Sequence, residues 1–118
     1  MKNRYEVDRS PAVDAWIDEP HRDRRVVRAV QLRVLRAVGS IERLGPLSSD
    51  DDLKKLREDL YQTRVLDWRI LSVIRGNHVI MADVVIKKKG RLTSAQLDAA
   101  ERRIAAYMSR RGNPPKGD

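Results

Sequence analysis

The fold is decided by the stretch LYQTRVLDWRILSVIRGNHVIMADVVIKKKG, residues 60–90. Its three apolar runs, 60–66, 68–74 and 79–86, have the length and the β-branched composition of strands. Gly76-Asn77 predicts a tight hairpin turn between the second run and the third. The stretch therefore predicts three consecutive antiparallel strands.

The third run is apolar at both alternating sets of positions except at Asp83. This pattern predicts a central strand that is covered on both faces. Cations nevertheless lie within or directly after the predicted strands, at Arg64, Arg69 and 87–89. We expect these cations on a sheet face that the helices leave partly open, where they would meet solvent or a ligand.

Two helices are predicted before the strands, joined closely enough to form an antiparallel hairpin. The shorter helix, over 12–20, has its apolar residues three and four positions apart. The longer helix, over 22–44, ends at the stop signal Gly45-Pro46, and Gly39 is expected to loosen or split it. The apolar stripes of the two helices are Val13, Trp16 and Ile17, and Val27, Val30, Val34, Val38 and Ile41.

Two further segments lie before the three strands. Residues 5–10 predict a short edge strand, and residues 46–59 predict a loop with at most one or two helical turns. The acidic run Asp50–Asp52 in this loop suits a helix N-terminus, where free backbone amides favour anions. We expect that capping role in preference to a metal site, which would need converging ligands from elsewhere.

A last helix is predicted over 92–111, where Thr93 and Gln96 form a capping box. Its apolar stripe is Leu97, Ala100, Ile104 and Tyr107 or Met108. The order of elements predicts the α+β class, with an antiparallel sheet packed against an N-terminal helical hairpin and a C-terminal helix. Residues 1–112 are expected to form a single domain, and residues 113–118 a flexible tail.

Composition limits the classes of protein to consider. The chain of 118 residues has no Cys, which excludes disulfides and thiolate metal sites. No apolar run approaches the roughly 20 residues that a bilayer span requires. The N-terminal sequence MKNRYEVDRS lacks the apolar core of a signal peptide. These features predict a cytoplasmic protein that does not associate with a membrane.

The net charge of +8 is distributed unevenly along the chain. Residues 1–59 have 13 Lys or Arg against 12 Asp or Glu, whereas residues 60–118 have 12 against 5. A one-sided excess of cations is what a phosphate-binding surface needs, because cations there release counterions condensed on a nucleic acid. The charge therefore favours nucleic-acid contact, and solubility alone is the other interpretation.

Four segments, in this order and at this spacing, resemble the RelE/ParE superfamily of toxins. They are VDAWIDEP at 13–20, LKKLREDLYQTRV at 53–65, WRIL at 68–71 and VVIKKKGRLTSAQLDAAERRIAAY at 84–107. The resemblance is to the phage-associated HigB-like branch, whose members belong to type II toxin–antitoxin systems, and it covers nearly the whole chain. It implies a RelE-like fold.

The same resemblance implies an mRNA interferase, an endoribonuclease that cuts mRNA, most often on the ribosome, and so inhibits translation. It implies metal-independent chemistry without a cofactor, in which the 2′-hydroxyl attacks the adjacent phosphate. The implied partners are a cognate antitoxin protein, mRNA and the ribosome. A non-catalytic toxin like ParE, which inhibits DNA gyrase, is the alternative function, because one fold can serve both.

The resemblance also implies which residues form the site. The implied catalytic residues are Arg64, Arg69, Lys87 and Lys88, and the implied RNA-binding residues are Lys55, Trp68, Lys89 and Arg91. Guanidinium and ammonium groups suit this chemistry because negative charge grows on the phosphate in the transition state.

Structural roles stay open for three parts of this set. Arg64 could be a surface cation paired across strands, Lys87–Lys89 could protect a sheet edge, and Trp68 could be half-buried core instead of a platform for a base. Gln62 and Ser72 depart from the family pattern, in which Lys or Glu and an aromatic residue are common at these positions. The general base is therefore unassigned.

Overall fold

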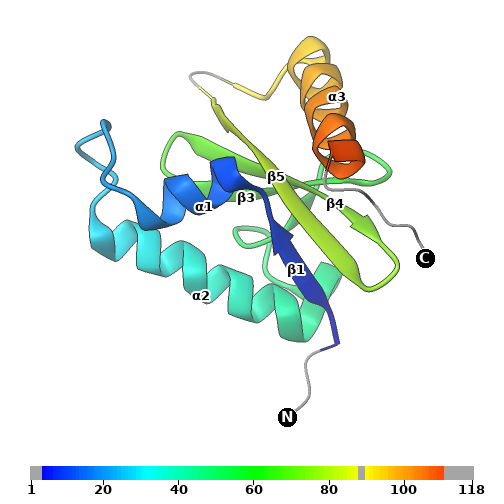
Figure 1. Cartoon of the computed structure of the whole chain (residues 1–118), viewed down its shortest axis with the longest axis horizontal. Helices are drawn as coiled ribbons and strands as arrows, with labels where there is room; N and C mark the ends of the chain where they lie inside the picture. Colours follow the sequence, from blue (N-terminus) through cyan, green and yellow to red (C-terminus); the bar gives the residue numbers. More distant parts are fainter. Residues whose placement is uncertain (1–3, 88–89, 111–118) are drawn as a thin grey trace.

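The computed structural model describes residues 4–87 and 90–110. It has a five-stranded sheet with helices on both faces, which confirms the α+β class (Figure 1). The elements in chain order are β1 (Glu6–Arg9), α1 (Pro11–Asp18), α2 (Arg28–Leu44), a 3₁₀ turn (Gly45–Leu47), β2 (Lys54–Lys55), β3 (Leu60–Val65), β4 (Trp68–Arg75), β5 (His78–Ile86) and α3 (Ser94–Arg110). No helix among the described residues is long and apolar enough to cross a bilayer.

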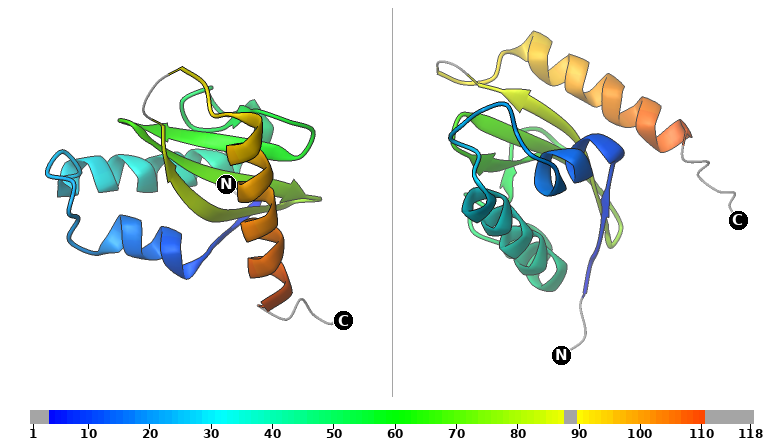
Figure 2. Two further views of the ribbon diagram at one scale, coloured as in Figure 1. Left: turned by 90° about the horizontal axis from the view of Figure 1, so that it is seen from above. Right: turned by 60° about the vertical axis from the view of Figure 1, so that its left-hand side comes forward.

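The sheet separates two apolar cores. Helices α1 and α2 cover one face, and α3 crosses the other, as the view on the right of Figure 2 shows. On the first face Ile17 of α1 and Ile41 of α2 pack with Ile70 of β4. On the second, Ala100 and Ile104 of α3 are buried with apolar residues of three strands, Leu60, Leu71, Val73 and Ile80.

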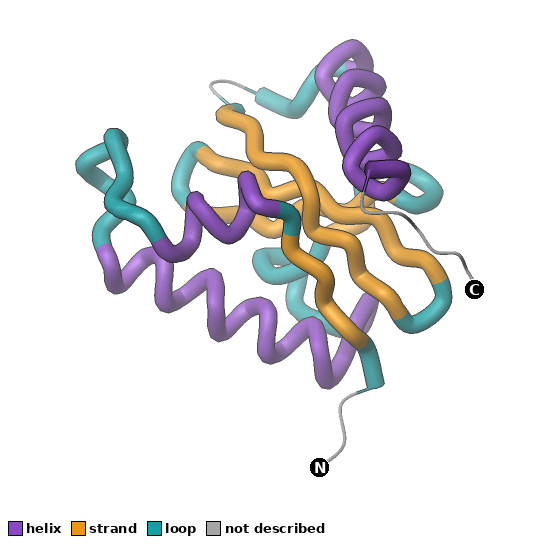
Figure 3. Tube along the Cα trace, viewed as in Figure 1, coloured by secondary structure: helices purple, strands orange, loops and turns teal. Residues whose placement is uncertain are grey.

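The sheet is mixed, although an antiparallel one was expected. Its strand order is β1-β5-β4-β3-β2, in which β1 runs parallel to β5 and the other neighbours are antiparallel. Figure 3 shows the strands of the sheet side by side, with helices on either side of them. The direction of β1 is fixed by its end, where Ser10 caps α1 and donates a hydrogen bond from Oγ to the carbonyl of Ala82 at 2.9 Å. The middle strand is therefore β4, while β5 is internal and covered on both faces.

A bulge in β5 changes which side chains share a face. Leu71 pairs with Asp83 and Ser72 with Met81, so Ala82 is an extra residue in β5. Before the bulge Ile80 packs on the α3 side, and after it Val85 does, although the two are an odd number of residues apart. The bulge therefore also brings Lys87 to the α3 side of the sheet.

Helix α2 begins six residues later than expected and is not split at Gly39. Asp23 delays the start, because its Oδ1 accepts a hydrogen bond from the backbone N–H of Arg25 at 3.0 Å and its own N–H donates to His21 Nδ1 at 3.1 Å. The predicted stripe position Val27 is consequently the N-cap, with half of its surface exposed, and Val26 is buried in its place.

The loop within 46–59 contains one further turn after the 3₁₀ turn, as expected: the backbone N–H groups of Asp52 and Leu53 donate to the carbonyl of Ser49 at 3.0 and 2.9 Å, and the Asp52 N–H also donates to Ser49 Oγ at 3.4 Å. The acidic run Asp50–Asp52 lies in this turn, which leads into β2 and not into a longer helix. Its carbonyls hold the neighbouring strand, because Thr63 Oγ1 donates to Asp52 O at 2.7 Å and the backbone N–H of Arg64 donates to Asp51 O at 2.9 Å.

Several local predictions are confirmed. The strands begin and end within about two residues of the predicted positions, and the α1 stripe is buried. The capping box forms, with the Thr93 N–H donating to Gln96 Oε1 at 2.8 Å and the Gln96 N–H donating to Thr93 Oγ1 at 3.1 Å. Gly76 has a φ of 61°, which the hairpin turn between β4 and β5 requires. The predicted tail, 113–118, lies outside the described residues.

Candidate functional site

A cleft of about 590 Å³ lies on the α3 side of the sheet, over the second half of β3 and the beginning of β4. We call it the cation cleft, because seven of its twelve lining residues are Lys or Arg. Its lining is Lys54, Lys55, Leu56, Arg57, Gln62, Arg64, Arg69, Lys87, Arg91, Leu92, Ser94 and Leu97. The lining contains no Asp, Glu or His among the described residues.

Strands β3 and β4 form the floor of the cation cleft. Arg64 and Arg69 are direct cross-strand partners, as are Gln62 and Leu71 in the next row. Directly opposed residues project from the same face of a sheet with their Cβ atoms about 5 Å apart. The register therefore forces two guanidinium groups to emerge side by side, Arg64 exposed and Arg69 only 4% exposed.

The guanidinium of Arg69 is anchored on one side. Its Nη1 donates hydrogen bonds to the carbonyls of Leu66 at 3.0 Å and of Trp68 at 2.7 Å, both at the turn between β3 and β4. Burial of the charged group lowers the pKa of Arg69, and the neighbouring charge of Arg64 lowers it further. Arg69 therefore holds a desolvated positive charge next to a second one.

The opposite edge of this guanidinium is unused. Nε is buried without a hydrogen-bond partner, and Nη2 donates to no other described residue. In Arg103 the same edge binds an anion: Nε and Nη2 donate hydrogen bonds to the two carboxylate oxygens of Asp83 at 2.9 and 2.8 Å. The free edge of Arg69 has the same geometry for two oxygens of an anion.

One wall of the cation cleft comes from β2 and the turn that follows it. Arg57 is held there by Asp98 at 2.6 Å, which raises its pKa, and by Glu101 at 2.8 Å. Both acids are on α3, so Arg57 ties this wall to the helix. Lys54 pairs with Gln62 and Lys55 with Tyr61 in the two-residue strand β2. Both lysines are exposed, and neither forms an ion pair with a described residue.

The other wall is formed by Lys87, Arg91 and the beginning of α3. The backbone N–H of Lys87 donates to the carbonyl of Asp67 at 2.7 Å, which fixes the chain at the end of β5 beside the turn that Arg69 also holds. Lys87 and Arg91 have no ion pair within the described ranges. The positive charge of this wall is therefore available to a ligand.

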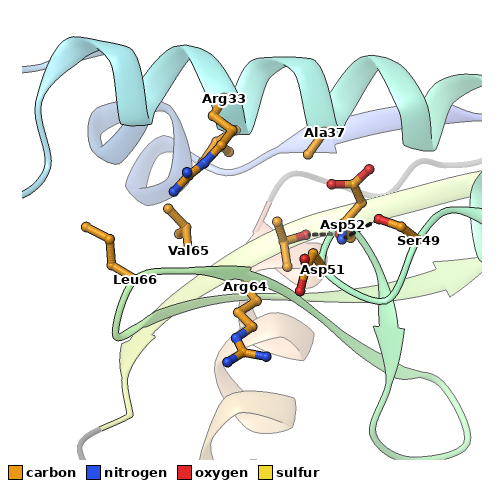
Figure 4. Close-up of a pocket in the computed structure, with 10 residues that line it drawn as sticks. Arg33, Ala37, Ser49, Asp51, Asp52, Arg64, Val65 and Leu66 are labelled. Atoms are coloured by element: carbon orange, nitrogen blue, oxygen red, sulfur yellow. Dashed lines mark hydrogen bonds between the residues drawn. The ribbon is translucent and has the colours of Figure 1, made fainter.

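A second pocket, of about 500 Å³, lies on the other side of β3, beneath α2 (Figure 4). Arg33, Asp51 and Asp52 line it together with residues of β3, Arg64 among them. Figure 4 shows the Arg64 side chain pointing away from Arg33 and from α2. Arg64 therefore delivers its charge to the cation cleft and not to this pocket.

The structure brings together five of the eight site residues expected from the sequence, Lys55, Arg64, Arg69, Lys87 and Arg91. Lys88 and Lys89 lie outside the described residues. Trp68 projects from the opposite face, where its ring makes edge contacts with Trp16 and His21 and its Nε1 donates to Asp23 Oδ2 at 3.0 Å. An RNA base in the cation cleft therefore cannot stack on Trp68.

The sequence prediction missed Lys54 and Arg57, which line the cleft. No local pattern marks either residue: β2 has only two residues, too few to identify a strand from a pattern, and Arg57 lies beyond it. Ser72, where relatives often have an aromatic residue, is fully buried on the face away from the cleft.

Groups that commonly transfer protons lie away from the cation cleft. His21 packs between the two Trp rings on the other face, and His78 lies at the distant hairpin turn. Tyr107, on the α3 stripe, donates a hydrogen bond to Asp8 Oδ1 at 2.9 Å. Among the described residues that line the cleft, the ammonium groups of Lys54, Lys55 and Lys87 are the candidates for donating a proton.

Comparison of the sequence with known proteins assigns no function to the cation cleft. The sequence matches no protein-family model, and it has no significant match among curated proteins.

Proposed function

We propose that the protein is a toxin of the RelE/HigB kind, with a RelE-like fold, which cuts mRNA in the cation cleft. The observation that carries the proposal is the unused Nε–Nη2 edge of Arg69, buried beside Arg64 in a cleft without a lining carboxylate. Paired guanidinium groups match the oxygens of a phosphodiester. The burial of Arg69 strengthens the electric field of its guanidinium group because water screens it less.

The reaction fits these groups. The 2′-oxygen of the RNA attacks the adjacent phosphorus, the bond to the 5′-oxygen breaks, and the products are a 2′,3′-cyclic phosphate and a free 5′-hydroxyl. Arg69 would bind two phosphate oxygens through its free edge, and Arg64 would stabilise the charge that grows in the transition state. No resident metal is needed for that stabilisation in this proposal.

Protonation of the leaving group is assigned to lysine. Lys87 lies at the end of the cleft next to the two arginines, so its ammonium group would protonate the leaving 5′-oxygen. The proton of the 2′-hydroxyl would pass to water at the open side of the cleft, and Lys54 and Lys55, on the opposite wall, would bind the RNA backbone. Arg57, neutralised by Asp98 and Glu101, would keep this wall in place and would not act on the phosphate.

The direct test is primer extension on mRNA extracted after induction of the protein, together with incubation of purified protein and RNA, with and without ribosomes. We expect discrete cuts with cyclic phosphate ends in the wild type. The cuts should be absent from the Arg69→Ala variant and retained in Arg36→Ala, a matched control on the exposed side of α2. RNA in which the 2′-hydroxyl at the cut is replaced by hydrogen should stay intact.

Intact mRNA with arrested DNA replication would contradict the proposal. That result would favour a non-catalytic toxin of the ParE kind. A nuclease that cuts the 2′-deoxy substrate as well would contradict the proposed chemistry, even though mRNA would still be lost.

A further inference from the structure

The part of the cation cleft around Gln62 differs chemically from the part around Arg64, Arg69 and Lys87. Gln62 lies on the floor two residues before Arg64 in β3, about 7 Å away along the strand. The two side chains share one face, because their cross-strand partners, Leu71 and Arg69, do. A nucleotide whose phosphate sits on the arginines would therefore bring a neighbouring base over Gln62.

The amide of Gln62 is not used by the fold. The other two glutamines of the chain are both engaged: Gln31 Nε2 donates to the carbonyls of Trp16 and Glu19, and Gln96 completes the capping box. Gln62 is half-buried, and its amide forms no hydrogen bond with another described residue. The amide therefore offers a donor and an acceptor side by side, both unpaired, on the cleft floor.

Leucines flank this amide from both walls. Leu56 follows β2 on one side, and Leu92 and Leu97 lie at the beginning of α3 on the other. All three are partly buried against the α3-side core, so their positions are set by packing. A flat apolar group could lie between them with its polar edge on Gln62, which is how proteins commonly hold an unstacked base.

We propose that the part of the cation cleft around Gln62 is a nucleobase subsite, in which Gln62 reads the edge of the base beside the phosphate on Arg64 and Arg69. This inference rests on the proposed function, since it needs RNA in the cleft. Gln62 is then a specificity-determining residue and not a catalytic one: it selects where the RNA is cut, while the arginines and lysines perform the reaction.

The test measures binding of four fluorescein-labelled homopolymeric tetranucleotides with 2′-fluoro sugars, which cannot be cleaved, by fluorescence anisotropy. We expect the wild type to prefer one base over the weakest by about tenfold, the size of one good amide–base contact. Gln62→Met keeps the length of the side chain and removes both polar groups, and should reduce this ratio to about twofold or less by the same reasoning. Gln96→Met makes the same change outside the cleft and should leave the ratio unaltered.

The outcomes separate this inference from the function on which it rests. If the wild type binds all four probes equally, or if Gln62→Met keeps the wild-type ratio, the base subsite is wrong while RNA binding stands. If none of the probes binds, and Arg69→Ala does not change the cutting of mRNA, the base subsite and the proposed function are both wrong. Gln62→Asn checks the geometry: its shortened amide should lower the ratio although the chemical group is retained, and a urea titration of each variant verifies that it is folded.

Discussion

Arg64 and Arg69 face each other directly across β3 and β4, and neither has a carboxylate ion-pair partner in the part of the chain that the structure describes. Asp67 acts on Arg69 by raising its pKa, and the Asp67 carboxylate is bound to Arg25 at 2.8 Å. Like charges in direct opposition destabilise a sheet. The fold therefore tolerates a local repulsion at the same position where it leaves a guanidinium edge unused.

Arg64→Gln should make the protein more stable and less active. The substitution removes the repulsion, and we expect the free energy of unfolding to rise by about 0.5 kcal/mol at low ionic strength. Urea titrations in about 20 mM and about 500 mM NaCl check this, because salt screens the repulsion in the wild type and should shrink the difference. Arg75→Gln, which removes an exposed arginine paired with Asp59, should show no such gain. A loss of stability in Arg64→Gln at low salt would contradict the prediction.

Arg69→Lys should weaken RNA binding although the charge is kept. A lysine cannot present the Nε–Nη2 edge and at the same time replace the two hydrogen bonds from Nη1 to the turn. We expect at least about a tenfold loss of affinity for an uncleavable RNA, about 1.4 kcal/mol, and about 1–2 kcal/mol less stability from the lost carbonyl contacts.

The salt dependence of RNA binding identifies the origin of that loss. Arg69→Lys should keep the wild-type slope of log affinity against log salt, whereas Arg69→Gln should reduce it by about one contact. An Arg69→Lys variant that binds RNA as tightly as the wild type would show that the guanidinium edge is not the phosphate site.

Leu66→Gly should stabilise the turn between β3 and β4. Leu66 has a φ of 54°, the single positive value for a non-glycine residue within 4–87 and 90–110, and a side chain there crowds its own backbone. We expect the free energy of unfolding to rise by about 1 kcal/mol. The matched reverse change, Gly76→Ala at φ 61° in the other hairpin, should lower it by a similar amount. Destabilisation by Leu66→Gly would mean that packing of the leucine outweighs the backbone strain.

Asp23→Asn should destabilise the protein near neutral pH and lose its effect in acid. Asp23 accepts hydrogen bonds from Arg25 and from Trp68 Nε1, which hold the pKa of its carboxyl well below the ordinary value of 3.8. A carboxyl with a lowered folded-state pKa stabilises the fold above its ordinary pKa, and this stabilisation is lost as the pH falls below it. The difference between wild type and variant should therefore shrink below about pH 4.

Urea unfolding followed by Trp fluorescence, at several values between about pH 7 and about pH 2.5, measures this difference. The fluorescence of Trp68 reports directly on the contacts of Asp23, because the Trp68 ring contacts His21 and its Nε1 donates a hydrogen bond to Asp23. Asp59→Asn, at an exposed pair with Arg75, is the control and should show a much weaker pH dependence. A difference that stays constant into acid would rule out the Asp23 contacts as its source.

Local patterns in the sequence predicted most elements because those elements depend on near neighbours. The α3 capping box needs only Thr93 and Gln96, and the turn between β4 and β5 needs only Gly76-Asn77 and its flanking runs. The errors fall where distant residues act. The start of α2 is set by a turn at Asp23 that Arg25 and Trp68 hold, and the two residues of β2 form a strand only because β3 offers them an edge.

The sequence by itself determined the α+β class, the order of most elements and the supply of cations near the end of the sheet. Only the tertiary structure decided which of those cations meet. Arg64 and Arg69 share a face because of the register between β3 and β4. Lys87 lies on the same face because the bulge at Ala82 shifts the alternation of β5. Trp68 does not line the cation cleft because it projects to the other face. The physical reason is that alternation along a strand gives two equivalent faces, and only pairing and packing with distant segments determine which face each side chain takes.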